Sequence, residues 1–92
     1  MNCIRFLIFG QVQKVFYRKY VSQALGKIGF VGYIKNLSNG SVEVTIKSEP
    51  NQNISNILEI LNQGSPKSKV ESINMDSCNE NIKFNKKFEV RY

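Results

Sequence analysis

The feature that most constrains the fold of this chain is the dipeptide Asn39-Gly40, which separates two segments of strand-like residues. Residues 30–35 precede the dipeptide, and residues 42–47 follow it with Val, Val and Ile alternating against Glu, Thr and Lys. An Asn-Gly pair between such segments is the strongest short-range signal for a β-hairpin. We therefore expect these two strands to be antiparallel neighbours in a sheet.

Hydrophobic spacing elsewhere predicts a strand at the N-terminus and two helices. Residues 4–9 alternate at the two-residue period of a strand with one buried face. Helical spacing follows in two stretches, which Gly29 and Gly64 are placed to end, and Asn53 is placed to cap the second. The first apolar stripe contains Tyr17, Val21, Ala24, Leu25 and Ile28, and the second contains Ile54, Ile57, Leu58 and Leu61.

Two more strands are expected in the C-terminal third. Val70, Ile73 and Met75 predict a strand whose alternation slips once near residues 71–72, and a β-bulge would explain the slip. Residues 88–92 alternate again at the end of the chain, with Phe88, Val90 and Tyr92 on one face. The element order is typical of an α+β fold built as a split βαβ sandwich, an antiparallel sheet of four to five strands with both helices on one face. We expect a single domain over residues 1–92, since domains run from about 50 to 250 residues.

The charge and the residue types that are missing limit the chemistry. A net charge of +6 and a pI near 9.5 favour polyanions or small anionic ligands, although the dispersed lysines are more simply explained as solvated surface. The chain contains no histidine. That composition excludes histidine general bases and the usual zinc sites.

The two cysteines, Cys3 and Cys78, are too few for a disulfide framework. No stretch is apolar enough to span a membrane, and the N-terminus lacks the pattern of a secretion signal. We therefore expect a cytoplasmic protein whose thiols are free. The predicted sheet does make the strands that carry the cysteines antiparallel neighbours, so the two thiols could approach each other.

A candidate anion site follows the first strand. The strand ends at Gly10, a short loop follows, and Arg18 lies in the first turn of the first helix. The exposed N–H groups of a helix N-terminus attract anions, and a guanidinium can grip a phosphate through paired hydrogen bonds. We expect Arg18 to bind a phosphoryl group, together with a loop that comprises Gln11, Val12, Gln13, Lys14, Val15, Phe16 and Tyr17.

Residues 10–18 also resemble the signature of the acylphosphatase family, Gly-x-Val-Gln-Gly-Val-x-Phe-Arg. Residues 10, 12, 13, 15 and 18 match it, and Tyr17 replaces one aromatic residue by another. The segments 32–36 and 39–43 resemble the family's second signature, and residues 64–66 and 88–92 resemble its C-terminal part. The resemblance covers nearly the whole chain, and two ordered motifs are more specific than either alone.

This resemblance implies a ferredoxin-like fold and the hydrolysis of acyl phosphates to carboxylate and inorganic phosphate. It further implies that Arg18 binds the phosphate, that Asn36 orients the attacking water, and that neither a metal nor an organic cofactor takes part. The partners that we expect are a small acyl phosphate and a phosphate or sulfate ion, with no membrane, no nucleic acid and a monomeric chain. A carboxylate leaves without needing a proton, which suits a chain that lacks histidine.

Two positions depart from the family. Lys14 replaces a loop glycine, and if that position requires a positive φ the lysine costs about 1–2 kcal/mol; its ammonium could also reach the phosphate and compensate. Leu37 replaces a small hydroxyl residue beside Asn36. Asn36 itself could be a turn-flanking residue that bonds its own backbone.

Two other functions fit parts of the sequence. The lysine could have converted the loop into an anion-binding module without catalysis. The topology also serves RNA-binding domains, which stack bases on aromatic residues of the open sheet face. The polar face of the third strand, with Glu43, Thr45 and Lys47, argues against that function.

Overall fold

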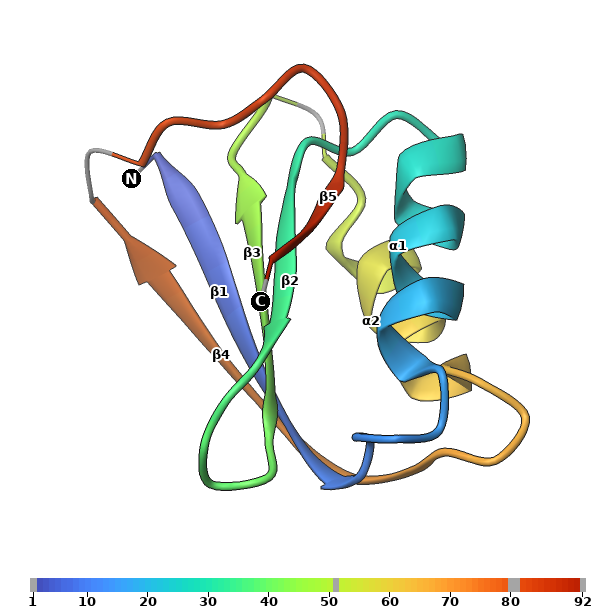
Figure 1. The fold of residues 1–92 in the computed structure, drawn as a ribbon. Helices are drawn as coiled ribbons and strands as arrows, with labels where there is room; N and C mark the ends of the chain where they lie inside the picture. The colour runs from blue at the N-terminus through green and yellow to red at the C-terminus, as the bar shows by residue number, and fades with distance from the viewer. Residues whose placement is uncertain (1, 51, 80–81, 92) are drawn as a thin grey trace.

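The chain folds into one sheet with both helices packed on the same face (Figure 1). The computed structural model describes residues 2–50, 52–79 and 82–91. The sheet order is β4-β1-β3-β2-β5, which is the predicted split βαβ arrangement with an added edge strand. The elements are β1 (Cys3–Gln11), α1 (Tyr17–Lys27), β2 (Gly32–Asn36), β3 (Val42–Lys47), α2 (Ile54–Gln63), β4 (Lys69–Cys78) and β5 (Glu89–Arg91).

Local signals place several boundaries where the sequence predicts them. Asn53 caps α2 because its side-chain oxygen accepts the Asn56 N–H at 3.1 Å. Gly64 ends α2 with a φ of 53°. The hairpin between β2 and β3 is confirmed, with Asn36 opposite Val42. β2 begins two residues later than predicted, at Gly32, and Asn36 is its last residue.

The predicted β-bulge lies in β4. Phe9 pairs with Ser72 and Gly10 pairs with Val70, so Glu71 is the extra residue of β4. The bulge brings the β4 backbone against Gly10, where an added Cβ would lie 2.1 Å from the carbonyl oxygen of Lys69. Gly10 also has a φ of 133°. This position therefore requires glycine for both space and conformation.

The sheet is not antiparallel throughout. β5 pairs with β2 in parallel, with Ile34 opposite Val90, whereas the other neighbouring strands are antiparallel. The reason is the path of the chain: β4 finishes at the end of the sheet where β2 begins, and the segment that follows passes over this end of the sheet to β5 (Figure 1). A strand that enters from there must run in the direction of β2. The predicted end of this strand, Tyr92, lies outside the described residues.

The prediction of free thiols is wrong. Cys3 and Cys78 lie directly opposite each other on β1 and β4. Their Cα atoms are 5.0 Å apart, and a disulfide joins the two residues. The pairing register of the two strands brings the cysteines together, although 75 residues separate them in the chain.

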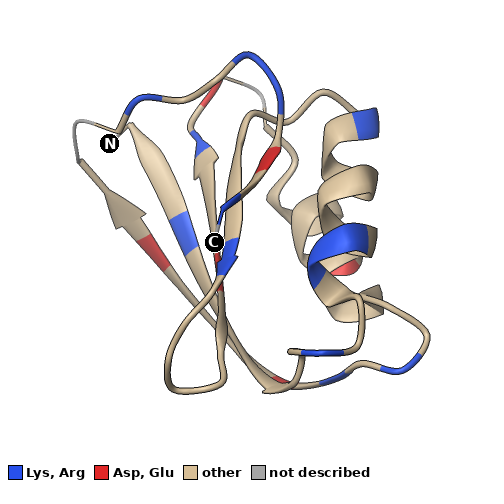
Figure 2. Ribbon diagram, in the orientation of Figure 1, with Lys and Arg blue, Asp and Glu red and all other residues tan. Residues whose placement is uncertain are grey.

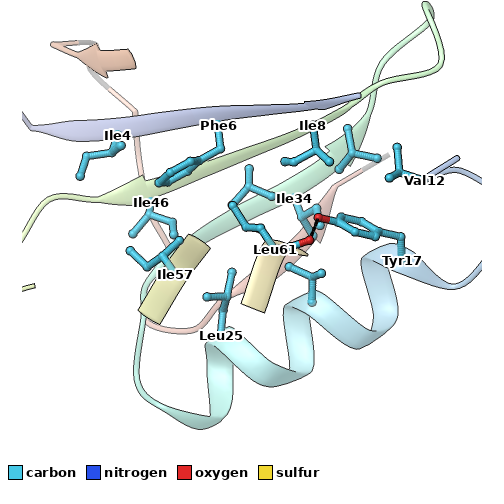
Figure 3. Packing of buried hydrophobic residues seen from close by; sticks show 13 residues of the cluster. Ile4, Phe6, Ile8, Val12, Tyr17, Leu25, Ile34, Ile46, Ile57 and Leu61 are labelled. Carbon is cyan, nitrogen blue, oxygen red and sulfur yellow. Dashed lines mark hydrogen bonds between the residues drawn. The ribbon is translucent and has the colours of Figure 1, made fainter. Parts of the chain in front are cut away.

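The core lies between the sheet and the helices (Figure 3). Tyr17 from α1 reaches across to α2, where its hydroxyl donates to the Leu61 carbonyl oxygen at 2.7 Å. Burial raises the pKa of Tyr17 far above its ordinary value. Ile28, predicted on the apolar stripe of α1, is 48% exposed because α1 ends one residue before it. The fully buried residues of the cluster include Phe6, Ile8, Val21, Leu25, Ile34, Val42, Val44, Ile46, Ile57 and Leu61.

A polar cluster covers part of the opposite sheet face. Glu43 accepts hydrogen bonds from the Tyr33 hydroxyl at 2.5 Å and from the Thr45 hydroxyl at 2.9 Å. The Arg5 Nε lies 3.5 Å from the same carboxylate, and the guanidinium of Arg91 lies 4.1 Å from the centre of the Tyr33 ring. Glu43 and Thr45 are therefore buried rather than presented to solvent as the strand pattern predicts. Burial and the Glu43 hydrogen bond raise the pKa of Tyr33.

Candidate functional site

A pocket of about 580 Å³ opens between the loop after β1, the N-terminal part of α1, and the ends of β2 and β5. Three segments that are distant in the sequence meet there: the loop with the start of α1, the end of β2, and β5. Their meeting places a helix N-terminus beside two strands. The residues that line the pocket are Val12, Lys14, Phe16, Tyr17, Arg18, Lys19, Ser22, Asn36 and Val90. The two residues predicted for catalysis, Arg18 and Asn36, therefore share one pocket.

The loop before α1 has an unusual backbone. Lys14 and Phe16 both have a φ of 62°, whereas Gln13 and Val15, which alternate with them, do not have positive φ. A backbone that alternates between right-handed and left-handed residues turns successive N–H groups toward one concave side, and such concavities bind anions. The loop leads directly into the N-terminus of α1, which adds the positive end of the helix dipole.

Arg18 lies in the first turn of α1. Its Nη1 lies 3.4 Å from the carbonyl oxygen of Arg91 on β5 and donates to it. The guanidinium is therefore half-buried and held between the helix and the edge strand. Arg18 also lines the pocket, next to the loop.

Asn36 is the last residue of β2. Its Oδ1 atom is buried and has no hydrogen-bond partner among the described residues. Buried polar atoms almost always have a partner, so an exception needs an explanation. The turn-flanking role belongs instead to Asn39, whose Oδ1 accepts the Ser41 N–H at 3.0 Å. Asn36 lines the pocket with this unsatisfied acceptor buried in its side chain.

Comparison with known proteins agrees with this geometry. The family model for acylphosphatases matches residues 4–90. An acylphosphatase from Vibrio parahaemolyticus is 39% identical over 77 residues, which cover 84% of this chain and 84% of that protein. The structure of an acylphosphatase from Coxiella burnetii superimposes with a TM-score of 0.81 and 31% identity, over 98% of this chain and 92% of that one. The acylphosphatase structure from Bacillus subtilis gives a TM-score of 0.77 and 29% identity, and each chain is covered completely.

The chain belongs to the acylphosphatase family. The predicted ferredoxin-like fold is confirmed by these structural relatives. No helix of the described ranges is both long and apolar enough to cross a membrane.

Not every residue of the family signature lines the pocket. Gln13 is directed to the β2–β3 hairpin, where its Nε2 donates to the carbonyl oxygens of Leu37 and Ser41 at 2.8 Å each. Val15 is fixed from another side, because the hydroxyl of Ser65 donates to its carbonyl oxygen at 2.6 Å. These bonds join the loop to the hairpin that carries Asn36 and to the segment after α2. Gln11 is exposed and does not line the pocket.

Three pocket residues were not predicted from the sequence: Lys19, Ser22 and Val90. Ser22 is four residues after Arg18 on α1, and residues at this spacing share a helix face, so helical periodicity could have identified it. Val90 comes from β5, whose place beside β2 depends on the long crossing from β4. Ser65 also could not be found locally, because its partner is 50 residues away in the sequence.

Proposed function

We propose that this chain hydrolyses acyl phosphates to a carboxylate and inorganic phosphate. The observation that carries the proposal is the shared pocket of Arg18, Asn36 and a loop with alternating φ. Membership of the acylphosphatase family supports the same reaction. The substrate is a small molecule, and we propose inorganic phosphate as a product-like ligand of the pocket.

The loop and Arg18 would hold the phosphoryl group. N–H groups of the loop and of the first turn of α1 donate to the phosphoryl oxygens, and the guanidinium donates paired hydrogen bonds to two of them. Phosphoryl transfer through a loose transition state needs positioning and charge stabilisation above all. Both are supplied by groups that the fold has already fixed, so little reorganisation is needed when the reaction occurs.

Asn36 would position the attacking water. Its buried Oδ1, which has no partner among the residues that the structure describes, would accept one proton of this water. The water oxygen then forms a bond to phosphorus as the bond from phosphorus to the acyl oxygen breaks, and the carboxylate leaves with the electron pair. One proton of the water passes to a phosphate oxygen. The doubly charged substrate and one water thus give a carboxylate and a singly charged phosphate, without a general base from the protein.

The two alternatives from the sequence lack this support. Lys14 has a φ of 62°, so the lysine leaves the loop in a left-handed conformation that glycine would also adopt. A loop that the lysine had made unable to support catalysis would be expected to lose that conformation. For RNA binding, the central aromatic residue of the open face, Tyr33, is 5% exposed and lies beneath the guanidinium of Arg91. It is not available for stacking on a base.

The test is the steady-state hydrolysis of acetyl phosphate by the wild type and by the variants Arg18→Ala and Asn36→Ala. Removal of one group that stabilises the transition state typically lowers kcat by about 10²–10³-fold, and we expect losses of this order for both variants. Lys27→Ala is the matched control, because Lys27 lies in the last turn of α1 away from the pocket. Wild-type kcat in both pocket variants, with circular dichroism unchanged, would refute the proposal.

The oligomeric state and the location are also proposals. We propose a monomer, which sedimentation equilibrium tests directly. The cytoplasmic location predicted from the sequence is opposed by the Cys3–Cys78 disulfide, because the cytoplasm keeps most thiols reduced. Alkylation of thiols in separated cell fractions, followed by mass spectrometry, shows in which compartment the oxidised chain occurs.

A further inference from the structure

The candidate active site carries more positive charge than a phosphoryl group requires. Lys14, Arg18 and Lys19 all line the pocket, and none of the described residues that line it is acidic. Figure 2 shows the positive residues in the loop between β1 and α1 and in the first turn of α1. The hydrolysis proposed above uses the guanidinium and the N–H groups of the loop. It gives no role to the ammonium groups of the two lysines.

Both lysines are available to a ligand. Lys14 and Lys19 are exposed, and neither forms an ion pair with a described carboxylate. Lys27, on the same helix as Lys19, is equally exposed but does not line the pocket. The positive charge at the pocket therefore depends on where Lys14 and Lys19 lie in the fold, and not only on the number of lysines in the chain.

The pocket is also larger than a phosphoryl group. Its volume of about 580 Å³ is that of a site for a whole small molecule, for which about 300–1,000 Å³ is usual. The acyl part of the substrate must occupy the remaining space. Phe16, which is 71% exposed, lines this space and offers an apolar surface for a carbon chain.

We propose that Lys19, together with Lys14, forms a subsite for a second anionic group on the acyl part of the substrate. This inference rests on the hydrolysis proposed above and narrows its substrate class. The preferred substrates are acyl phosphates whose carbon chain ends in a carboxylate or another anion, rather than those with an uncharged acyl group. Lys19 is then a specificity-determining residue, and it acts mainly through substrate binding.

The test compares two substrates, acetyl phosphate and succinyl phosphate, of which the second has one more methylene group and a terminal carboxylate. We expect the wild type to have the higher kcat/KM for succinyl phosphate, with most of the difference in KM. In Lys19→Gln the ratio of the two kcat/KM values should fall by about two- to fivefold, the effect of one solvent-exposed ion pair. Lys19→Arg should keep the ratio, and Lys27→Gln is the control for an equal change in net charge.

Salt provides a second measurement. The Debye length falls from about 10 Å at 0.1 M salt to about 3 Å at 1 M, so added salt should reduce the preference of the wild type and leave that of Lys19→Gln almost unchanged. A ratio that is equal in the wild type, Lys19→Gln and Lys27→Gln overturns the subsite but not the hydrolysis. A wild type that hydrolyses neither substrate overturns both.

Discussion

Lys14 offers a test of backbone strain that is independent of activity. It is exposed, and its φ of 62° lies in the left-handed region. This conformation costs a residue other than glycine about 1–2 kcal/mol, because its Cβ approaches the following carbonyl oxygen. Glycine avoids the cost but loses about 0.5–1 kcal/mol more chain entropy on folding. We expect Lys14→Gly to raise the free energy of unfolding by about 0.5–1 kcal/mol.

The assay is urea unfolding followed by circular dichroism, with the disulfide kept oxidised. For an m-value of about 1–3 kcal/mol per molar urea, the midpoint should rise by roughly 0.2–1 M. Lys14→Ala removes the same charge but keeps the strain, so its midpoint should stay near that of the wild type. Lys67→Gly, at an exposed turn residue without positive φ, should lose about 0.4–1 kcal/mol. If Lys14→Gly unfolds at or below the midpoint of Lys14→Ala, the strain argument fails.

Three further predictions concern stability. Reduction of the Cys3–Cys78 bond removes a cross-link across 75 residues and should lower the free energy of unfolding by about 4 kcal/mol. A urea midpoint that is unchanged in dithiothreitol would contradict this. Because burial raises the pKa of Tyr17, the folded chain keeps a proton that the unfolded chain releases above about pH 10. This contribution to the free energy of unfolding is therefore complete below that pH and is lost above it. Tyr17→Phe should make the decline of this free energy with pH shallower. Equal slopes for the two proteins in urea titrations at alkaline pH would exclude the effect. Gly10→Ala should lower the free energy of unfolding by about 2–5 kcal/mol, because its Cβ would lie 2.1 Å from a β4 carbonyl oxygen. In the control Gly40→Ala the Cβ meets nothing within 4 Å, and the loss should be about 1–2 kcal/mol. Similar thermal midpoints for the two variants would show that the backbone moves away from the added methyl group.

The fold was predictable where a structure depends on neighbours in the sequence. The cap of α2 at Asn53 and its end at Gly64 are local hydrogen-bonding and conformational effects. The bulge in β4 appeared as a slip in the alternation of apolar residues, because each side chain must still face the core. Arg18 could be chosen as a site residue because it lies at a predicted helix N-terminus, whereas the role of Asn36 came from the resemblance to the acylphosphatase signatures. The structure brings the two residues to one pocket.

The features that the sequence did not determine depend on contacts between distant segments. The direction of β5 depends on the end of the sheet at which β4 finishes, because the chain enters β5 from that end. Nothing within residues 89–91 encodes this direction. Gln13 belongs to the loop signature, but its carboxamide holds the hairpin 24 and 28 residues away. The burial of Glu43 depends likewise on Tyr33 and on Arg5 from another strand.

The amino-acid sequence by itself determined the type and the order of the elements and the residues from which a phosphate site could be built. Tertiary structure alone decided that the two cysteines are bonded, that the last strand is parallel to its neighbour, and that Lys19 lines the pocket together with Lys14 and Arg18. The physical reason is that helices, caps and turns are stabilised by groups a few residues apart. Strand neighbours and pockets form instead where segments remote in the chain pack together, and their partners are fixed only when the whole core is buried.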